Sequence, residues 1–412
     1  MELDTGATAW MLMSASLVLL MTPGLALFYG GMVRGKSVLN MMMMSFGAIA
    51  VVGVVYVLWG WSMSYGADLG GIVGNPFDQF GLSGAIYDAA GEFAIDDFGV
   101  PGIVGVGFQA TFAIITVALI SGAIADRAKF GTWMVFVAVW VTLCYFPMAH
   151  MVWGGGLLSG DGPFASIATP IDFAGGTVVH INAGIAALVG CIIIGKRNGY
   201  GTVNLAPHNL TLSLIGASLL WVGWFGFNAG SAAGANALAG VAMMNTQVAT
   251  AAAALAWMAC EWFVIKKPSL LGIISGAVAG LVAITPAAGF VNPTGALVIG
   301  LVAGIAAYIA SVHVKKALGY DDSLDVFGVH GVAGIVGALL VGIFADASIN
   351  ELGKDASLIK QFYGVAVTIV YTGVVTAIIL YVLQAVMGLR PGNIEEEEGL
   401  DVTEHGERAY TT

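Results

Sequence analysis

The chain has 412 residues, of which 58% are hydrophobic and only 9% are charged, and its formal net charge at pH 7 is −11. Soluble globular domains carry about a quarter charged residues, so this composition excludes that class. The negative balance also excludes the basic surface of a nucleic-acid-binding protein, and we expect no nucleic-acid partner.

Long stretches without Asp, Glu, Lys or Arg predict the membrane spans in chain order. A helix of about 20 apolar residues crosses the hydrocarbon core of a bilayer. Seven stretches have room for one such helix each, namely Asp4 to Arg34, Lys36 to Asp68, Asp97 to Asp126, Lys129 to Asp161, Asp172 to Lys196, Asp325 to Asp346 and Lys360 to Arg390.

Two further stretches, from Arg197 to Glu261 and from Lys267 to Lys315, are too long for one span. The first would fold back at or just after residues 228–234, and the second between residues 285 and 293, which contain helix-breaking prolines. Seven single spans plus two pairs give eleven, so we predict an all-α integral membrane protein with eleven transmembrane helices. An odd number of spans places the two chain ends on opposite sides of the membrane.

Basic residues follow every second predicted span, which orients the chain because Lys and Arg collect in cytoplasmic loops. They occur at Arg34 and Lys36, Arg127 and Lys129, Lys196 and Arg197, Lys266 and Lys267, Lys315 and Lys316, and Arg390 and Arg408. We therefore expect an inner (plasma) membrane protein with its N-terminus outside and its C-terminus in the cytoplasm. No cleavable signal peptide is expected, because the start lacks a basic segment. Residues 1–390 would form the transmembrane domain and residues 391–412 a cytoplasmic tail.

Two histidines lie inside predicted spans, and both stand in the frame Val-His-x-x-Ala-Gly: His180 and His330. Spans one to five and six to ten form two halves of opposite orientation, as in the inverted repeats of transporters. The histidines fall in spans five and ten, which such a repeat would bring together. An ionisable residue in a span is a functional-site candidate, and burial should keep both rings uncharged. The alternative is two unrelated histidines, each bonded to a backbone carbonyl.

Aromatic residues gather near the predicted outer ends of the same spans. Phe108 and Phe112 share a helix face, Trp153 follows span four, and Phe227 precedes Ser231 at the end of span six. Aromatic faces beside a hydroxyl would attract a small cation. The alternative for each aromatic residue taken singly is the belt that membrane proteins place at the lipid interface.

Asp172 precedes His180 by eight residues, about 12 Å along a helix, so it cannot touch that ring. It most simply caps span five, and attraction of cations to the outer mouth is the alternative. The cysteines Cys144, Cys191 and Cys260 fall within predicted helices and form no Cys-x-x-Cys pair. We therefore expect no metal ligand among them, and no cofactor.

Five long strings carry a resemblance to a known family. They are Pro23-Gly-Leu-Ala-Leu-Phe-Tyr-Gly-Gly31, Ala149-His-Met-Val-Trp-Gly-Gly-Gly-Leu-Leu158, Asp172-Phe-Ala-Gly-Gly-Thr-Val-Val-His-Ile-Asn182, Trp224-Phe-Gly-Phe-Asn-Ala-Gly-Ser231 and Asp325-Val-Phe-Gly-Val-His-Gly-Val332. Together they resemble the ammonium transporter, methylammonium permease and Rhesus (Amt/MEP/Rh) family, on its bacterial ammonium transporter branch. The resemblance runs from span one into the tail and implies a transporter or channel for ammonium, not an enzyme.

The resemblance implies a role for each candidate residue that matches a family motif. His180 and His330 correspond to a pore-lining pair, Phe112 and Phe227 to a gate, Trp153, Ser231 and Phe112 to an outer substrate site, and Asp172 to a supporting aspartate. Phe108 is added to the substrate site because it shares a helix face with Phe112. It also implies a homotrimer in membrane lipid, ammonium, ammonia or methylammonium as substrate, and a cytoplasmic PII-type signal protein as partner of the tail.

An apolar pore suits ammonium because a bare ion costs tens of kcal/mol to desolvate, whereas a neutral polar molecule costs only a few. Ammonium can shed a proton and pass as ammonia, and the transport cycle could be electroneutral or electrogenic. A water or glycerol channel would need paired Asn-Pro-Ala motifs, and a retinal pump would need a lysine deep in a span; neither is present. Two further functions are compatible with the same residues: a haem protein with histidine axial ligands, and an ammonium sensor that signals through the tail.

Overall fold

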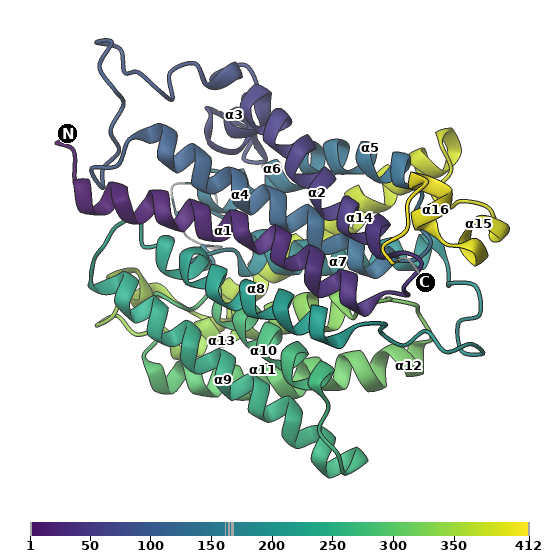
Figure 1. Ribbon diagram of the computed structural model, residues 1–412. Coiled ribbons are helices and arrows are strands. Elements are labelled where there is room, and N and C mark those ends of the chain that lie inside the picture. The colour runs from purple at the N-terminus through teal and green to yellow at the C-terminus, as the bar shows by residue number, and fades with distance from the viewer. Residues whose placement is uncertain (1, 161, 164, 166–168, 411–412) are drawn as a thin grey trace.

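The computed structural model describes residues 2–160, 162–163, 165 and 169–410, and helices make up most of that part (Figure 1). Ten helical segments in it are long and apolar enough to cross a membrane. Four are single α-helices: α1 (Thr5–Met32), α8 (Leu210–Gly230), α9 (Ala237–Ile265) and α14 (Leu358–Val386). The chain is thus a multi-pass membrane protein, as predicted.

The other six spans join shorter helical pieces end to end. They are α2 (Val38–Val55), η1 (Tyr56–Gly60) and α3 (Trp61–Tyr65); α4 (Gly102–Ile120) and η3 (Ser121–Ile124); α5 (Phe130–Trp140), η4 (Val141–Tyr145) and α6 (Phe146–Trp153); η5 (Gly176–Ile181) and α7 (Asn182–Ile194); α11 (Pro293–Tyr308), η6 (Ile309–Val314) and α12 (Lys315–Leu318); and η7 (Phe327–Val332) and α13 (Ala333–Phe344). Of the linking pieces, η3 is a 3-10 turn and the others are π-helical.

Each predicted span has a helix, but the count of eleven membrane-crossing helices is not confirmed. The helix in the place of the eighth span, α10 (Leu270–Ile284), has 15 residues, fewer than the length that crosses a bilayer core. It begins at Ser269, whose hydroxyl caps the Gly272 N–H at 2.8 Å, and it stops before Pro286, which cannot continue a helix. The two predicted reversals lie where expected, between α8 and α9 and between α10 and α11.

Polar side chains start several of these helices by accepting an otherwise unpaired backbone N–H of the first turn. The capping residues are Asp4 for α1, Asn209 for α8, Asn236 for α9, Asn292 for α11 and Ser357 for α14. Because loops between apolar helices must supply these caps, the helix starts are set by short polar residues in an otherwise apolar sequence.

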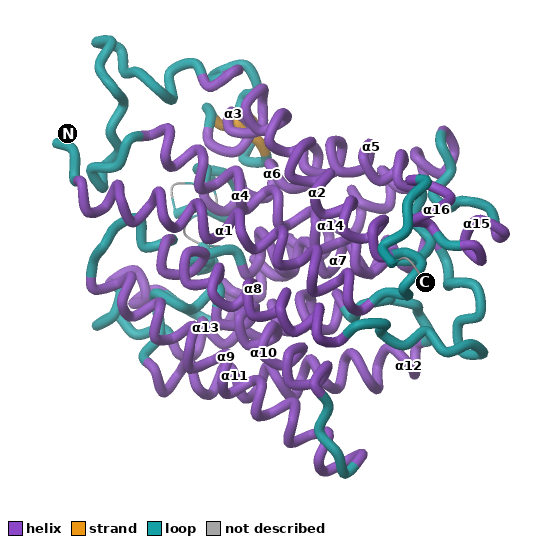
Figure 2. The backbone as a smooth tube through the Cα atoms, viewed as in Figure 1, coloured by secondary structure: helices purple, strands orange, loops and turns teal. Residues whose placement is uncertain are grey.

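The loops gather at the two ends of the helices, and the chain termini lie at opposite ends (Figure 2). Near the N-terminal end, strands β1 (Asp68–Leu69) and β2 (Val73–Gly74) pair antiparallel beside α3, and a 3-10 turn, η2 (Phe80–Leu82), follows. Another 3-10 turn, η8 (Glu351–Asp355), precedes α14. The tail forms α15 (Asn393–Glu398) and α16 (Leu400–His405).

The two halves of the chain meet through equivalent helices, as the inverted repeat predicts. The first helix of each half, α1 and α8, pack along each other, and the last helices meet where α7 and η7 touch. At the second contact the backbones are so close that a Cβ on Gly184 would lie 2.3 Å from the backbone nitrogen of Gly331. Small residues allow such backbone contact between membrane helices, and this contact lies next to both histidines.

Candidate functional site

His180 and His330 lie side by side at the contact between the two halves. Their Nδ1 atoms are 3.2 Å apart, and the side chains belong to residues that are 1% and 2% exposed. One Nδ1 must donate and the other accept, so the pair holds opposite tautomers. His180 also stacks on Trp224, with ring centroids 5.2 Å apart. Among the described residues, His180 Nε2 has no hydrogen-bond partner.

Both histidines belong to π-helical turns, His180 to η5 and His330 to η7. Such turns are rare in proteins and are frequent at functional sites. Each turn sits at the start of the last helix of its half, so the two turns occupy equivalent places in the repeat. Local sequence pattern did not predict them, because the hydrogen-bond register of one turn depends on the packing around it.

Two phenylalanine rings stack next to His180. The rings of Phe112 on α4 and Phe227 on α8 are 4.1 Å apart with an interplanar angle of 18°, and both residues are fully buried. The Phe227 ring lies 5.9 Å from the His180 ring. On the other side Phe112 meets the edges of Phe108 and Trp153, with centroids 4.8 Å and 6.3 Å away. The aromatic residues therefore form a continuous series that ends at the histidine pair.

Beyond the phenylalanine pair opens a cavity of about 470 Å³, which we call the mouth cavity. The predicted residues Phe108, Phe112, Trp153 and Ser231 line it, together with Met11, Trp61, Tyr65, Asp96, Phe98, Gly105, Gln109, Phe173, Gly230 and Ala233. Ser231 Oγ donates to the Phe227 carbonyl at 2.8 Å, which leaves its lone pairs free to accept. The cavity thus combines aromatic faces with a hydroxyl, an amide and the carboxylate of Asp96.

Asp172 joins the mouth cavity to the turn that carries His180. Its carboxylate accepts the backbone N–H groups of Gly175, Gly176, Thr177 and Val178 at 2.5–3.2 Å, and also the Thr177 hydroxyl. Its backbone carbonyl accepts the Trp153 Nε1–H at 2.9 Å. Burial raises the pKa of this carboxyl, and the hydrogen bonds from Thr177 oppose that rise. The contacts are those of a helix cap, the first of the two interpretations of the sequence.

Asp322 is the equivalent residue of the second half, and the sequence analysis missed it. It stands eight residues before His330, as Asp172 stands eight residues before His180. It is 1% exposed and accepts the backbone N–H groups of Val326 and Phe327 at 3.1 and 2.7 Å. Burial, with a contribution from Asp325, raises the pKa of its carboxyl to about 6. The repeated spacing was the signal that could have identified it.

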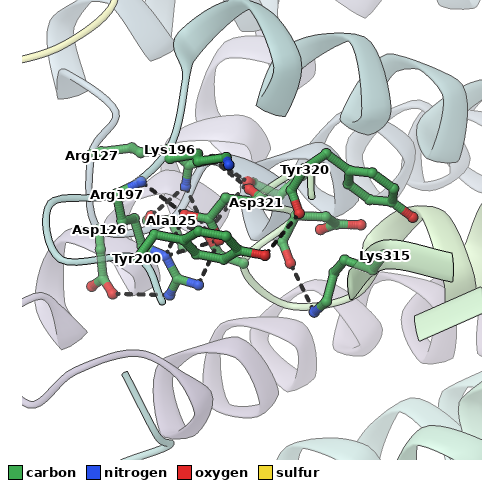
Figure 3. Close-up of polar contacts among 12 residues, drawn as sticks. Ala125, Asp126, Arg127, Lys196, Arg197, Tyr200, Lys315, Tyr320 and Asp321 are labelled. Atoms are coloured by element: carbon green, nitrogen blue, oxygen red, sulfur yellow. Dashed lines mark hydrogen bonds and ion pairs between the residues drawn. The ribbon is translucent and has the colours of Figure 1, made fainter. Parts of the chain in front are cut away.

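A buried polar network ties the loops together at the end of the molecule where α12 lies (Figure 3). Arg197 pairs with Asp321, Nη2 to Oδ1 at 2.7 Å, and lies 3.6 Å from Asp126. Arg127 is fully buried and donates to the carbonyls of Gly195 and Asp321, among others. The loop of the adjacent Asp322 is therefore held in place by arginines from two other loops, which follow the third and fifth spans.

Two mouth-cavity residues with an amide or carboxyl side chain were not predicted, Gln109 and Asp96. Gln109 directly follows Phe108 and could have been found from its polarity within a span, whereas Asp96 lies in a long loop whose path the sequence does not indicate. No group of three or more His, Cys, Asp or Glu residues in the described part of the chain could hold a metal ion.

Comparisons with known proteins agree over nearly the whole chain. A model described as the Ammonium Transporter Family matches residues 9–410. The chain is 52% identical to an ammonium transporter of Aquifex aeolicus, over 99% of this chain and 94% of that protein. It is 45% identical to an ammonium transporter of Bacillus subtilis, over 99% of each.

Solved structures give the same result for the fold. A crystal structure of Mep2 from Saccharomyces cerevisiae superimposes with a TM-score of 0.84 at 33% identity, covering 95% of this chain and 91% of that one. A structure described as a sensor Amt protein has a TM-score of 0.87 at 31% identity, covering 97% and 98%.

Proposed function

We propose, because this chain belongs to the Ammonium Transporter Family, that it collects ammonium in the mouth cavity and passes ammonia along the two histidines. Membership makes the chain a membrane transporter of ammonium and not an enzyme. The route of the substrate through the protein, the orientation of the chain in the membrane and the regulation of transport are parts of this proposal.

The observation that carries this route is the order of the buried rings. From the mouth cavity a solute meets Trp153 and Phe108, then the stacked Phe112 and Phe227, then His180 paired with His330. We infer that the stacked rings act as a gate, because they are fully buried and lie between the cavity and the histidines. The free Nε2 of His180 would then offer a hydrogen bond to a small polar solute.

The same order explains how ammonium is chosen over other cations. The mouth cavity is lined by seven aromatic residues, the Ser231 hydroxyl and the Asp96 carboxylate, which attract a small cation by ring quadrupoles and charge. The path beyond it is lined by phenylalanine and buried imidazole, where an ion that cannot lose its charge is strongly disfavoured. Ammonium leaves its proton behind and enters as ammonia, whereas K⁺ and Na⁺ have no neutral form.

Uptake of ammonium or methylammonium into proteoliposomes, recorded together with current, tests the proposal. Transport of substrate without K⁺ current is expected. A current proportional to substrate flux would mean that the proton crosses separately, whereas flux without current would mean that it returns to the side it came from. Binding without flux would instead support the sensor function, and a Soret band in the purified protein would support the haem function.

Replacing Trp153 with leucine should weaken apparent affinity while K⁺ stays excluded. A cation–π contact contributes about 0.5–2 kcal/mol, so the half-saturation concentration should rise about 2- to 30-fold. The matched control is Trp262→Leu, since Trp262 is 52% exposed on α9 and does not line the mouth cavity. Loss of K⁺ exclusion in Trp153→Leu, measured as current, would contradict a recruiting role.

We further propose that residues 391–412 form a regulatory tail on the cytoplasmic side, with the mouth cavity facing outside. The basic loops lie at the tail end of the molecule, which the positive-inside rule places in the cytoplasm. The tail docks on the bundle: Asp401 accepts the Asn40 N–H at 2.8 Å, Glu404 accepts the Phe130 N–H at 3.1 Å, and Glu396 pairs with Arg390. A homotrimer and a PII-type partner of this tail are included in the proposal.

Deleting residues 391–412 should leave flux through the purified protein within about twofold and abolish its response to an added PII-type protein. The reason is that the described part of the tail, residues 391–410, contacts α2 and α5 and none of the rings along the proposed route. Flux and regulator response are measured in the same liposomes. Collapse of flux without any regulator would show that the tail is needed for the structure of the pore.

A further inference from the structure

His150 is a buried histidine that no step of the proposed route uses. His150 lies in the last turn of α6, three residues before Trp153, and is 0% exposed. Its Nδ1 lies 3.1 Å from the backbone carbonyl oxygen of Ser64, and its Nε2 lies 2.9 Å from Asp68 Oδ1. The ring therefore touches α3, β1 and its own helix at once.

Both neighbours of the ring are hydrogen-bond acceptors. A carbonyl oxygen can only accept, and an ionised carboxylate can only accept. The Asp68 side chain is 42% exposed, and the same oxygen also accepts the Gly71 N–H at 2.9 Å, so this oxygen acts as an acceptor. Both short contacts can be hydrogen bonds together only when both ring nitrogens carry a proton, which makes the ring an imidazolium.

The elements that the ring connects are those that build one side of the mouth cavity. Ser64 stands between Trp61 and Tyr65, which line the cavity, and α6 ends at Trp153, which lines it too. The β1–β2 hairpin is held against the segment after α6 by a second bond, from Leu157 N–H to the Gly71 carbonyl at 2.7 Å.

Close packing around the ring leaves it little freedom to find other partners. A Cβ on Gly154 would lie 2.7 Å from His150 Nδ1 and 2.1 Å from the Ser64 carbonyl oxygen. Ionisable groups on the elements packed against α6 are Tyr56 on η1, Tyr65 on α3, Asp68 on β1, Cys144 and Tyr145 on η4, and His180 on η5; β2 has none. Of these, Asp68 is the one whose side chain is within hydrogen-bonding distance of the ring.

We propose that His150 is a positioning residue for the substrate site in the mouth cavity, and that its doubly protonated ring latches the β1–β2 hairpin to the helices that carry Trp61, Tyr65 and Trp153. The effect of this latch on transport rests on the proposed function. The latch is complete while the ring carries both protons. When the ring carries a single proton, one of the two contacts is no longer a hydrogen bond, and apparent affinity for the substrate falls.

The protonation state is tested directly by nitrogen NMR of the ¹⁵N-histidine-labelled full chain, with His150 assigned among the six histidines by its loss in His150→Gln. The spectra are recorded from about pH 5 to pH 8, and the wild type should show two protonated ring nitrogens within that range. A single protonated nitrogen throughout the range in the wild type would overturn the proposal.

Transport of methylammonium over the same range tests the positioning role. Glutamine places an amide N–H near the Nε2 position, so His150→Gln keeps a pH-independent bond to Asp68 and should hold a constant half-saturation concentration. Asparagine places it near Nδ1, so His150→Asn keeps the bond to Ser64 alone and should raise that concentration about 3- to 10-fold at low pH, the effect of one hydrogen bond.

His313→Gln is the matched control and should keep the wild-type pH profile. His313 is exposed on η6 and is far in sequence from the residues that line the mouth cavity. Identical behaviour of the Gln and Asn variants at position 150 would overturn the positioning role. Absence of any uptake by the wild type would overturn the proposed function instead, and the NMR measurement would still decide the protonation of His150.

Discussion

Replacing His330 with alanine is expected to slow uptake of ammonium about 5- to 150-fold and to weaken the exclusion of K⁺. The substitution removes one partner of the 3.2 Å contact and leaves Nδ1 of His180 buried without a hydrogen bond, which costs about 1–3 kcal/mol. If the free-energy barrier for ammonia rises by this amount, the rate falls tenfold for about every 1.4 kcal/mol, which gives the expected range. The space left by the ring also has room for water, which lowers the cost of admitting an ion.

The measurement is paired flux and current in proteoliposomes, with His313→Ala as the control. His313 is exposed on η6, and its ring contacts Tyr308 and not the buried pair. Unchanged rate and unchanged K⁺ exclusion in His330→Ala would show that the histidine pair is not on the transport path, even if the protein still transports ammonium.

Asp172→Ala should have the largest effect on stability of any single substitution near the site. It removes the acceptor of four backbone N–H groups at the start of η5, and these groups are buried. Each unsatisfied buried donor costs about 1–3 kcal/mol, so the loss should exceed about 4 kcal/mol. Because the same turn carries His180, transport should be lost together with stability. Thermal unfolding in detergent and flux in liposomes measure the two effects.

Two variants calibrate this result. Asp172→Asn keeps one acceptor oxygen and should lie between alanine and the wild type. Asp322→Ala removes the acceptor of two N–H groups at the equivalent turn, so it should destabilise less than Asp172→Ala. An Asp172→Ala protein that unfolds at the wild-type temperature would rule out the capping role.

The helices and the meeting of the two histidines could be predicted because they depend on features that the sequence states directly. Charge-free stretches mark each helix, and the repeated Val-His-x-x-Ala-Gly frame marks equivalent positions in the two halves. The short α10 was counted as a full span because hydropathy does not register that Ser269 and Pro286 bound it to 15 residues.

The features that escaped prediction depend on packing between distant segments. Asp322 lies in a loop whose position is set by Arg197 and Arg127, residues that come from two other loops. The contact of His150 with Asp68 joins residues 82 apart in the chain. The place of Asp96 in the mouth cavity depends on the path of the long segment between α3 and α4, which contains little regular structure to predict.

The spacing of the His180 and His330 rings depends on a neighbouring residue that has no side chain. The main chains approach at residues 184 and 331 because residue 184 lacks a side chain. One added methyl at residue 184 would need the halves to separate by about 1 Å to reach an ordinary van der Waals distance. A change of that size would part the imidazoles without altering either of them, so the hydrogen atom in place of a carbon at residue 184 sets the distance between the two rings.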